Sequence, residues 1–178
     1  MTPDSHRQLE YAALRATIRE RGTVRMALLP VIFISWAAIA VATGAVITVA
    51  LGTLVPLMVL VAGFEGIFAL YTNVERIGRY LQVFHEDSGG WEHVAMEFGQ
   101  RFPGGGSDPL FGRLFGVAIS INYLPAALGG STPELVVLAI LHFIPIFRIR
   151  AAQSAAARQR AIDLERFTAV RGSGQALP

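Results

Sequence analysis

The feature that most constrains the fold is a long uncharged run near the start of the chain. Between Met26 and Thr72 the chain runs for 47 residues, and Glu65 is the only charged side chain among them. A membrane-spanning helix needs about 20 consecutive apolar residues, so this run has the length of two spans joined by a tight turn. We therefore expect this part of the chain to cross a membrane twice, as a helical hairpin.

A second apolar run, from Leu114 to Phe147, is interrupted near its middle by two glycines, Ser131 and Glu134. A serine followed three residues later by glutamate is typical of a capped helix start. The two arms on either side of this turn measure about 22 Å each at 1.5 Å per residue, shorter than the roughly 30 Å of hydrocarbon core. We expect a second, shorter hairpin whose flanking arginines reach toward the headgroups.

The positions of the basic residues predict the orientation of both hairpins. All 15 basic residues are arginine, as is common in proteins from GC-rich genomes. Residues 1–25 hold five of them, residues 74–113 hold four and residues 148–171 hold six, whereas the two hairpin turns hold none. By the positive-inside rule, both termini and the central loop are expected in the cytoplasm, with the spans in the bacterial inner (plasma) membrane.

The expected fold is all-α: an integral membrane protein with four transmembrane helices, arranged as two helical hairpins, and with cytoplasmic amphipathic helices. A composition of 53% hydrophobic and only 16% charged residues agrees with this class. The expected segments are an N-terminal cytoplasmic amphipathic helix (1–25), the first transmembrane hairpin (26–73), a cytoplasmic helix and loop (74–109), the second, shorter hairpin (110–147), and a C-terminal cytoplasmic helix and tail (148–178).

Amphipathic patterning continues beyond the second span. An apolar face persists past Thr72, so residues Leu54–Asp87 are expected to form one helix. Aromatic and aliphatic side chains at nearly helical spacing predict a further helix over Trp91–Arg101, with its aromatic side in the headgroups. Such helices offer surfaces for self-association or for a partner.

The glycine-rich stretch from Pro103 to Pro109 is typical of a flexible turn. It lacks the Gly-Lys-Ser/Thr ending of a phosphate-binding loop. We expect Asp108 to cap the third span and Pro109 to open it.

Small side chains recur at helical spacing on both helices of the first hairpin. Helices in lipid associate where small residues let their backbones approach closely. Two stripes are therefore expected to face each other: Ala38, Ala42 and Ala45 on the first helix, and Ala62, Gly66 and Ala69 on the second.

Glu65 is expected near the middle of its span, where a carboxylate costs several kcal/mol unless it is paired, hydrated or protonated. One hypothesis is a protonated acid that donates a hydrogen bond between helices; another is ion or proton conduction. Its expected polar companions are Ser120, Asn122 and Tyr123 on the third span and His142 on the fourth. His142 by itself is more typical of a hydrogen-bonded structural residue than of a ligand.

The central loop concentrates imidazoles and carboxylates, the side chains that bind divalent metals. The candidate ligands are His85, Glu86, His93 and Glu97. Their spacing fits none of the established zinc patterns, so a solvated acidic loop, a metal site and an acid/base pair all remain open. We expect no bound metal or cofactor.

Several functional classes are excluded or disfavoured. The chain has no cysteine, which removes disulfides, zinc thiolate sites and thiol catalysis, and a net charge of +2 gives no case for nucleic-acid binding. We expect a non-catalytic membrane subunit whose partners are the lipid bilayer and either copies of itself or another membrane protein. The alternatives are a small oligomeric ion or proton channel that uses Glu65, and a metal-dependent membrane enzyme that uses the loop with His85 and His93.

Overall fold

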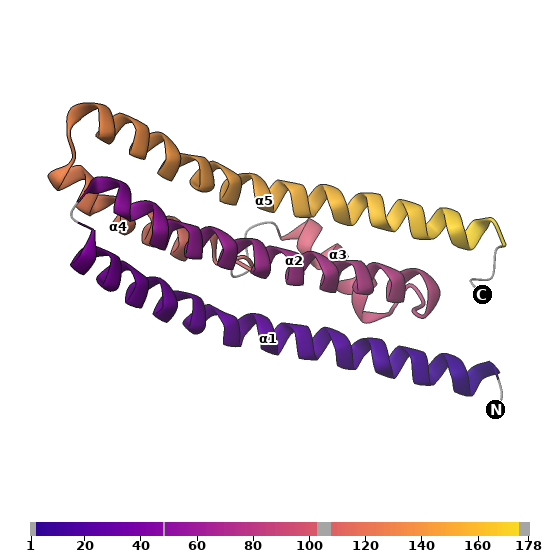
Figure 1. Ribbon diagram of the computed structural model, residues 1–178. Helices are drawn as coiled ribbons and strands as arrows, with labels where there is room; N and C mark the ends of the chain where they lie inside the picture. Colours follow the sequence, from indigo (N-terminus) through magenta and orange to yellow (C-terminus); the bar gives the residue numbers. More distant parts are fainter. Residues whose placement is uncertain (1–2, 48, 103–107, 175–178) are drawn as a thin grey trace. The chain divides into compact units, whose positions relative to one another are not determined.

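The structure, a computed structural model, describes residues 3–47, 49–102 and 108–174. All regular secondary structure in these ranges is helical, so the all-α prediction is confirmed. The elements are α1 (Pro3–Val46), the 3-10 helix η1 (Ala50–Thr53), α2 (Leu54–Phe84), α3 (Trp91–Arg101), α4 (Gly112–Gly129) and α5 (Thr132–Gly172) (Figure 1).

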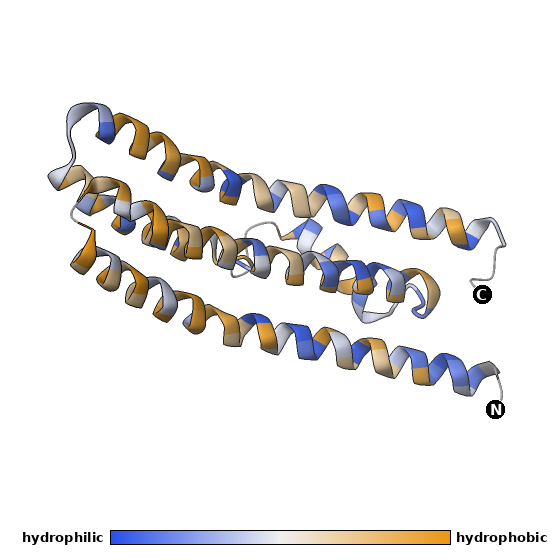
Figure 2. Cartoon of the chain, viewed as in Figure 1, coloured by the Kyte–Doolittle hydropathy of each residue, from blue (hydrophilic) through white to orange (hydrophobic). Residues whose placement is uncertain are grey.

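Three helical segments of the described chain are long and apolar enough to cross a membrane. They are Asp4–Val46, Ala50–Phe84 and Thr132–Gly172. Figure 2 shows that α1, α2 and α5 are each apolar over one part of their length and hydrophilic over the other. The length and apolar character of these helices are typical of a membrane-associated protein, and the apolar part of each helix is the part suited to lipid.

The helix boundaries differ in places from those that the hydropathy pattern predicts. The predicted N-terminal helix and first span form one helix of 44 residues, α1, although Pro30 removes the N–H that would bond the Met26 carbonyl. Helix α2 ends at Phe84 and not at Asp87, because the backbone N–H groups of residues 85 and 86 both donate to the Leu81 carbonyl. The predicted helix Trp91–Arg101 is confirmed as α3.

The chain divides into two compact units, which we call unit 1 and unit 2. Unit 1 falls within residues 1–24, 70–107 and 155–178, and unit 2 within residues 25–69 and 108–154. Unit 2 thus collects most of the two apolar hairpins, and unit 1 collects most of the three polar segments.

An aromatic cluster forms the core of unit 2. Phe115 of α4 is fully buried, and its ring centroid lies 5.3 Å from that of Phe33 in α1 and 5.4 Å from that of Phe64 in α2. Phe64 also stacks on Phe68, one helical turn further along α2. Three helices therefore meet around a single phenylalanine.

Helices α1 and α2 approach each other at Gly63, where a Cβ atom would come within 2.5 Å of the Ile32 side chain. The predicted contact between the two small-residue stripes is wrong. All six stripe residues are exposed, and a Cβ at Gly66 would meet nothing within 4 Å. The close approach uses the helix face next to the predicted one. The stripe residues are Ala38, Ala42, Ala45, Ala62, Gly66 and Ala69.

Large apolar side chains cover the outside of unit 2. Examples on its long helices and on α4 are Ile34, Val41, Met58, Leu128 and Phe147, all exposed. Exposed apolar surface of this extent marks contact with lipid or with another protein.

Side chains cap the two helices of the second hairpin in different ways. Ahead of α5, the Ser131 N–H and Oγ–H both donate to the Glu134 carboxylate, at 2.9 and 2.7 Å, which confirms the predicted capping. Helix α4 begins at Gly112 and not at Pro109, because Phe111 adopts a left-handed backbone conformation with φ 53°. The predicted turn over residues 103–107 lies outside the described residues.

Asp108 binds the start of α4 as predicted, although the helix begins later than expected. Its carboxylate accepts the backbone N–H of Arg113 at 3.2 Å. This satisfies one of the N–H groups that a helix start leaves without a partner.

Candidate functional site

A hydrogen-bonded cluster of polar side chains is buried in unit 2. The Asn122 carbonyl of α4 accepts the Trp36 indole N–H of α1 at 3.1 Å. The Asn122 amide group donates to the Thr53 carbonyl of η1 at 2.8 Å and contacts His142 Nε2 of α5 at 3.0 Å. One asparagine thus joins four elements of the unit, and both Asn122 and His142 are at most 5% exposed.

The cluster specifies the protonation of His142. Its Nδ1 lies 2.8 Å from the Leu138 carbonyl, which only accepts hydrogen bonds, so Nδ1 carries the hydrogen. Nε2 of the neutral ring then accepts from Asn122. Both amide hydrogens and the carbonyl of Asn122 therefore have partners, and rotating the amide by 180° would break all three hydrogen bonds.

The other two predicted polar companions differ in their surroundings. The Tyr123 hydroxyl donates to the Leu135 carbonyl at 3.1 Å, and its ring centroid lies 5.3 Å from that of His142. Ser120 is exposed and donates to the Gly116 carbonyl of its own helix. The structure brings Asn122, Tyr123 and His142 together and leaves Ser120 apart.

Glu65 does not join this cluster, so its predicted companions are wrong. Its carboxylate accepts Arg148 of α5 at 2.8 Å, and the Arg148 guanidinium lies 4.7 Å from the centroid of the Phe68 ring. The side chains of Glu65 and Arg148 are 41% and 39% exposed. Because Arg148 is the first charge after the apolar stretch of α5, Glu65 lies level with the end of that stretch.

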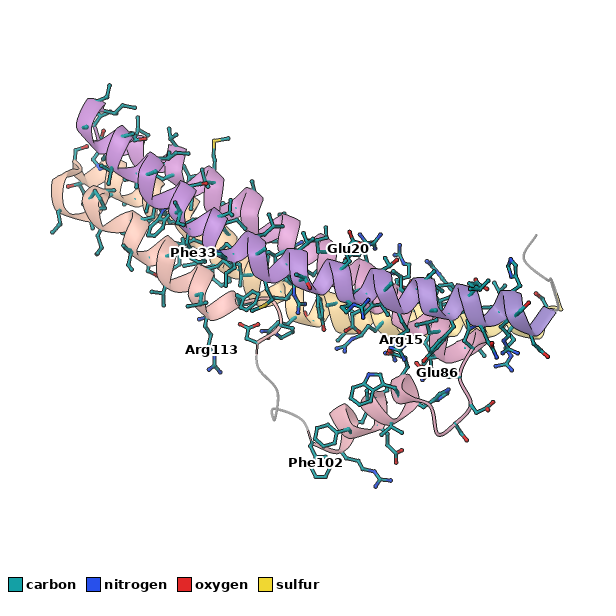
Figure 3. The ribbon with its side chains drawn as sticks, turned by 90° about the horizontal axis from the view of Figure 1, so that it is seen from below. Arg15, Glu20, Phe33, Glu86, Phe102 and Arg113 are labelled. Atoms are coloured by element: carbon teal, nitrogen blue, oxygen red, sulfur yellow. The ribbon has the colours of Figure 1, made fainter. Side chains whose placement is uncertain are left out.

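The centre of unit 1 is a charged cluster around Glu92 of α3. The Glu92 carboxylate accepts Arg15 of α1 at 2.7 Å and Arg79 of α2 at 3.1 Å. Arg15 also pairs with Glu86, and Figure 3 shows these two side chains pointing toward each other. A Cβ at Gly78 of α2 would lie 2.9 Å from Glu92 Oε2, so the glycine admits the carboxylate.

Arg79 is the more enclosed of the two arginines in this cluster, at 7% exposed. Besides Glu92, it donates to the Gln82 side chain at 2.7 Å. The backbone carbonyl of Gln82 lies 3.1 Å from His93 Nε2, and the Gln82 side-chain amide nitrogen lies 3.3 Å from His93 Nδ1. Helix α3 is thereby attached to α2 through its polar side.

Further ion pairs join α2 and α5 within unit 1. Arg76 donates to Asp163 at 3.2 Å, and Arg160 lies 3.5 Å from Glu75. In the first pair the arginine belongs to α2, and in the second it belongs to α5. They fix how the two helices face each other in this unit.

The four candidate metal ligands have separate partners. His85 lies 3.5 Å from the Glu10 carboxylate, and Glu86 pairs with Arg15. His93 contacts Gln82, and Glu97 pairs with Arg101 in the next turn of α3. Within the described residues, no three histidine, cysteine or acidic side chains are arranged to hold a metal ion.

Glu92 is the residue that sequence reasoning missed. It stands among the candidate ligands but has no sequence signal of its own, because its partners lie 13 and 77 positions away. The Glu92 carboxylate lies where a side chain at position 78 would be, so the need for Gly78 becomes clear only from the structure.

The opposite side of α3 is apolar and uncovered. Three large apolar side chains of α3, together with Phe102 directly after the helix, are each 50–69% exposed, and Figure 3 shows Phe102 directed away from Arg15 and Glu86. In a soluble protein the apolar side of a helix is usually buried and its charged side exposed. Here the side with Glu92 is buried and the aromatic side is exposed. The exposed residues are Trp91, Val94, Phe98 and Phe102, and we call them the α3 aromatic face.

Comparisons with protein-family models, curated proteins and solved structures found no match. Function is therefore argued from the clusters and surfaces themselves. Three features are available for that argument: the closed polar cluster of unit 2, the Glu65–Arg148 pair and the α3 aromatic face.

The stability of unit 1 is expected to fall in mild acid because of His85. Burial lowers the pKa of His85, with Arg7 acting in the same direction and Glu10 opposing both. The unfolded chain therefore binds the proton first, so the stabilisation is complete above the ordinary histidine pKa of about 6.5 and is lost as the pH falls below it. Thermal unfolding followed by circular dichroism should show a lower midpoint at pH 5.5 than at pH 7.5.

The matched variants for this pH test are His85→Phe and His6→Gln. His85→Phe keeps a ring against Tyr11 and Tyr80 but cannot take up a proton, so it should reduce the pH dependence. His6 is exposed, and His6→Gln should leave the dependence unchanged. The opposite ranking of the two variants would contradict the assignment to His85.

Proposed function

We propose that the chain is a non-catalytic, multi-pass subunit of the bacterial inner membrane that acts by associating with copies of itself or with another membrane protein. The observation that carries this proposal is the closed polar cluster of unit 2. Asn122 forms hydrogen bonds with Trp36, with the Thr53 carbonyl and with His142, all on neighbouring elements. A transport path or reaction centre needs polar groups that face water or substrate, and these groups face one another.

The proposed topology has four spans, α1, α2, α4 and α5, as two hairpins with both termini in the cytoplasm. Three helices with the length and apolar character of spans support it. Helix α4 has 18 residues, about 27 Å at 1.5 Å per residue, close to the roughly 30 Å of a hydrocarbon core. The absence of arginine from the hairpin turns supports the orientation.

Association is assigned to the α3 aromatic face. Tryptophan is among the residues that contribute most binding energy at protein interfaces, and phenylalanine is enriched there. The exposed charges of the helix, Glu97 and Arg101, pair with each other, so α3 brings no net positive charge to anionic headgroups. We therefore propose that a protein surface covers the α3 aromatic face. Contact with lipid headgroups, as expected from the spacing, is the alternative that the test distinguishes.

The test is site-specific photo-crosslinking in native membranes. A photoreactive amino acid at Phe98 should give a crosslink to a protein, either a second copy or a partner, identified by mass spectrometry. The same amino acid at Phe147, an exposed apolar position of unit 2, is the matched control for contact with lipid. Crosslinks from Phe98 to lipid alone, like those expected from Phe147, would contradict the proposal.

A small ion or proton channel is the rival function, and the partial exposure of Glu65 favours it. Against it stands Arg148, which supplies the opposite charge at 2.8 Å. Ion or proton flux in proteoliposomes that disappears in the Glu65→Gln variant would replace the proposed function with this one. A metal-dependent enzyme would need His85 and His93 at one site, and they contact Glu10 and Gln82 respectively.

A further inference from the structure

An apolar groove of about 600 Å³ runs between α2 and α5 in unit 2. Ile119 of α4 lies in its floor and is almost fully buried. Apolar side chains of both helices line it, beginning at Leu54 on α2 and at Leu141 on α5. Among the described residues, Glu65 and Arg148 are the only charged groups in its lining.

The charged pair sits at one end of this groove. On α2, Glu65 is the last lining residue in the direction of the chain. On α5, Arg148 is the last but one, before Ile149. They pair at 2.8 Å, and each keeps about two fifths of its side chain exposed. The groove therefore offers an apolar channel that ends in a carboxylate and a guanidinium side by side.

We infer that this groove binds a phospholipid with a zwitterionic phosphoethanolamine headgroup. The acyl chain lies along the apolar part, the phosphate pairs with Arg148 and the ammonium pairs with Glu65. Guanidinium–phosphate and ammonium–carboxylate hydrogen bonds are both charge-assisted and strong. A phosphocholine headgroup has no N–H to donate to Glu65, and a phosphoglycerol headgroup has no cation, so each satisfies only half of the site.

The length of the groove agrees with an apolar chain that lies along the two helices. Leu54 and Glu65 are eleven residues apart on α2, about 16 Å at 1.5 Å per residue. Arg148 is the first charge beyond the apolar stretch of α5, the position where a span reaches the headgroups. A headgroup bound there leaves its acyl chain along the groove.

The experiment measures lipid retention by the purified full chain, and it rests on the membrane placement proposed above. Native mass spectrometry from detergent, after equilibration with phosphatidylethanolamine, phosphatidylcholine or phosphatidylglycerol of identical acyl chains, should show about tenfold preference for the first, equivalent to about 1.4 kcal/mol. Equal retention of the three lipids would overturn the inference and leave the membrane placement intact. A chain that stays soluble without detergent would instead overturn the placement.

Two variants locate the site. Ala62 lines the groove and is exposed, so Ala62→Trp should fill it and reduce phosphatidylethanolamine retention about tenfold. Ala45→Trp, at an exposed position of α1 outside the groove, is the control for an added indole. Glu65→Gln should remove the preference for ethanolamine over choline while phosphate binding persists.

The outcomes separate lipid from a protein occupant. Equal retention in the Ala62→Trp and Ala45→Trp variants, with unchanged unfolding midpoints, would overturn the inference. Dissociation of an oligomer by Ala62→Trp without any loss of lipid would also overturn it, because the groove would then be a contact between copies. The comparison of headgroups on the unmodified chain tests the inference even if a variant fails to fold.

Discussion

Replacing Glu92 with glutamine is expected to lower the free energy of unfolding of unit 1 by about 3–5 kcal/mol, the usual cost of removing one partner from a buried ion pair. Glutamine keeps the shape of the side chain but not its charge. Arg15 retains Glu86, whereas Arg79, only 7% exposed, loses its carboxylate partner. Thermal unfolding in detergent, followed by far-UV circular dichroism, measures the loss.

The same helix supplies the control for this prediction. Glu97 also pairs with an arginine, Arg101, but the pair is exposed and lies within one turn of α3. Glu97→Gln should change stability by less than about 0.5 kcal/mol, as is usual for exposed helical pairs. If the two glutamine variants are equally stable, the charged cluster is not the element that attaches α3 to α1 and α2.

Local sequence patterns predicted the helices well because each depends on neighbouring residues. The apolar runs indicated long apolar helices, the serine and glutamate of the turn predicted the capped start of α5, and spacing alone predicted α3 as Trp91–Arg101. Boundaries failed where one residue changed the backbone. Phe111 takes a left-handed conformation, and this delayed the start of α4 to Gly112.

Contacts between helices were predicted poorly, because a small error in rotation selects another face. Adjacent positions of an α-helix point about 100° apart, given 3.6 residues per turn. The predicted stripe included Ala62 and Gly66, whereas Gly63 makes the close approach to Ile32. Small residues are frequent throughout this hairpin, so their spacing left several faces nearly equivalent.

The depth of Glu65 was misjudged for a different reason. Counting along its own span placed the carboxylate near the middle, but its surroundings are determined by the helix it faces. The apolar stretch of α5 is shorter than that of α2 and ends at Arg148, which pairs with Glu65. An acid that is isolated in sequence thus has an arginine partner 83 positions away, and no local pattern reports such a pair.

Replacing Asn122 with leucine is expected to destabilise unit 2 by about 2–5 kcal/mol, since hydrogen bonds between membrane helices contribute about 0.6 kcal/mol each on average and about 1.7 kcal/mol at most, and three are lost. Leucine has the same branching as asparagine but leaves the Trp36 N–H, the Thr53 carbonyl and His142 Nε2 without their partner. Unfolding in mixed detergent micelles measures the change. Ser120→Ala on the same helix is the control, because that hydroxyl is exposed and bonds within α4.

A double-mutant cycle with His142→Leu then shows whether the hydrogen bonds or the shapes hold the helices together. If the hydrogen bonds matter, the double variant should lose less stability than the sum of the two single variants, because removing both partners leaves neither of that pair unsatisfied. Strict additivity would mean that Asn122 and His142 stabilise unit 2 independently. The cluster would then no longer act as one closed unit, and it would no longer support the proposed non-catalytic function.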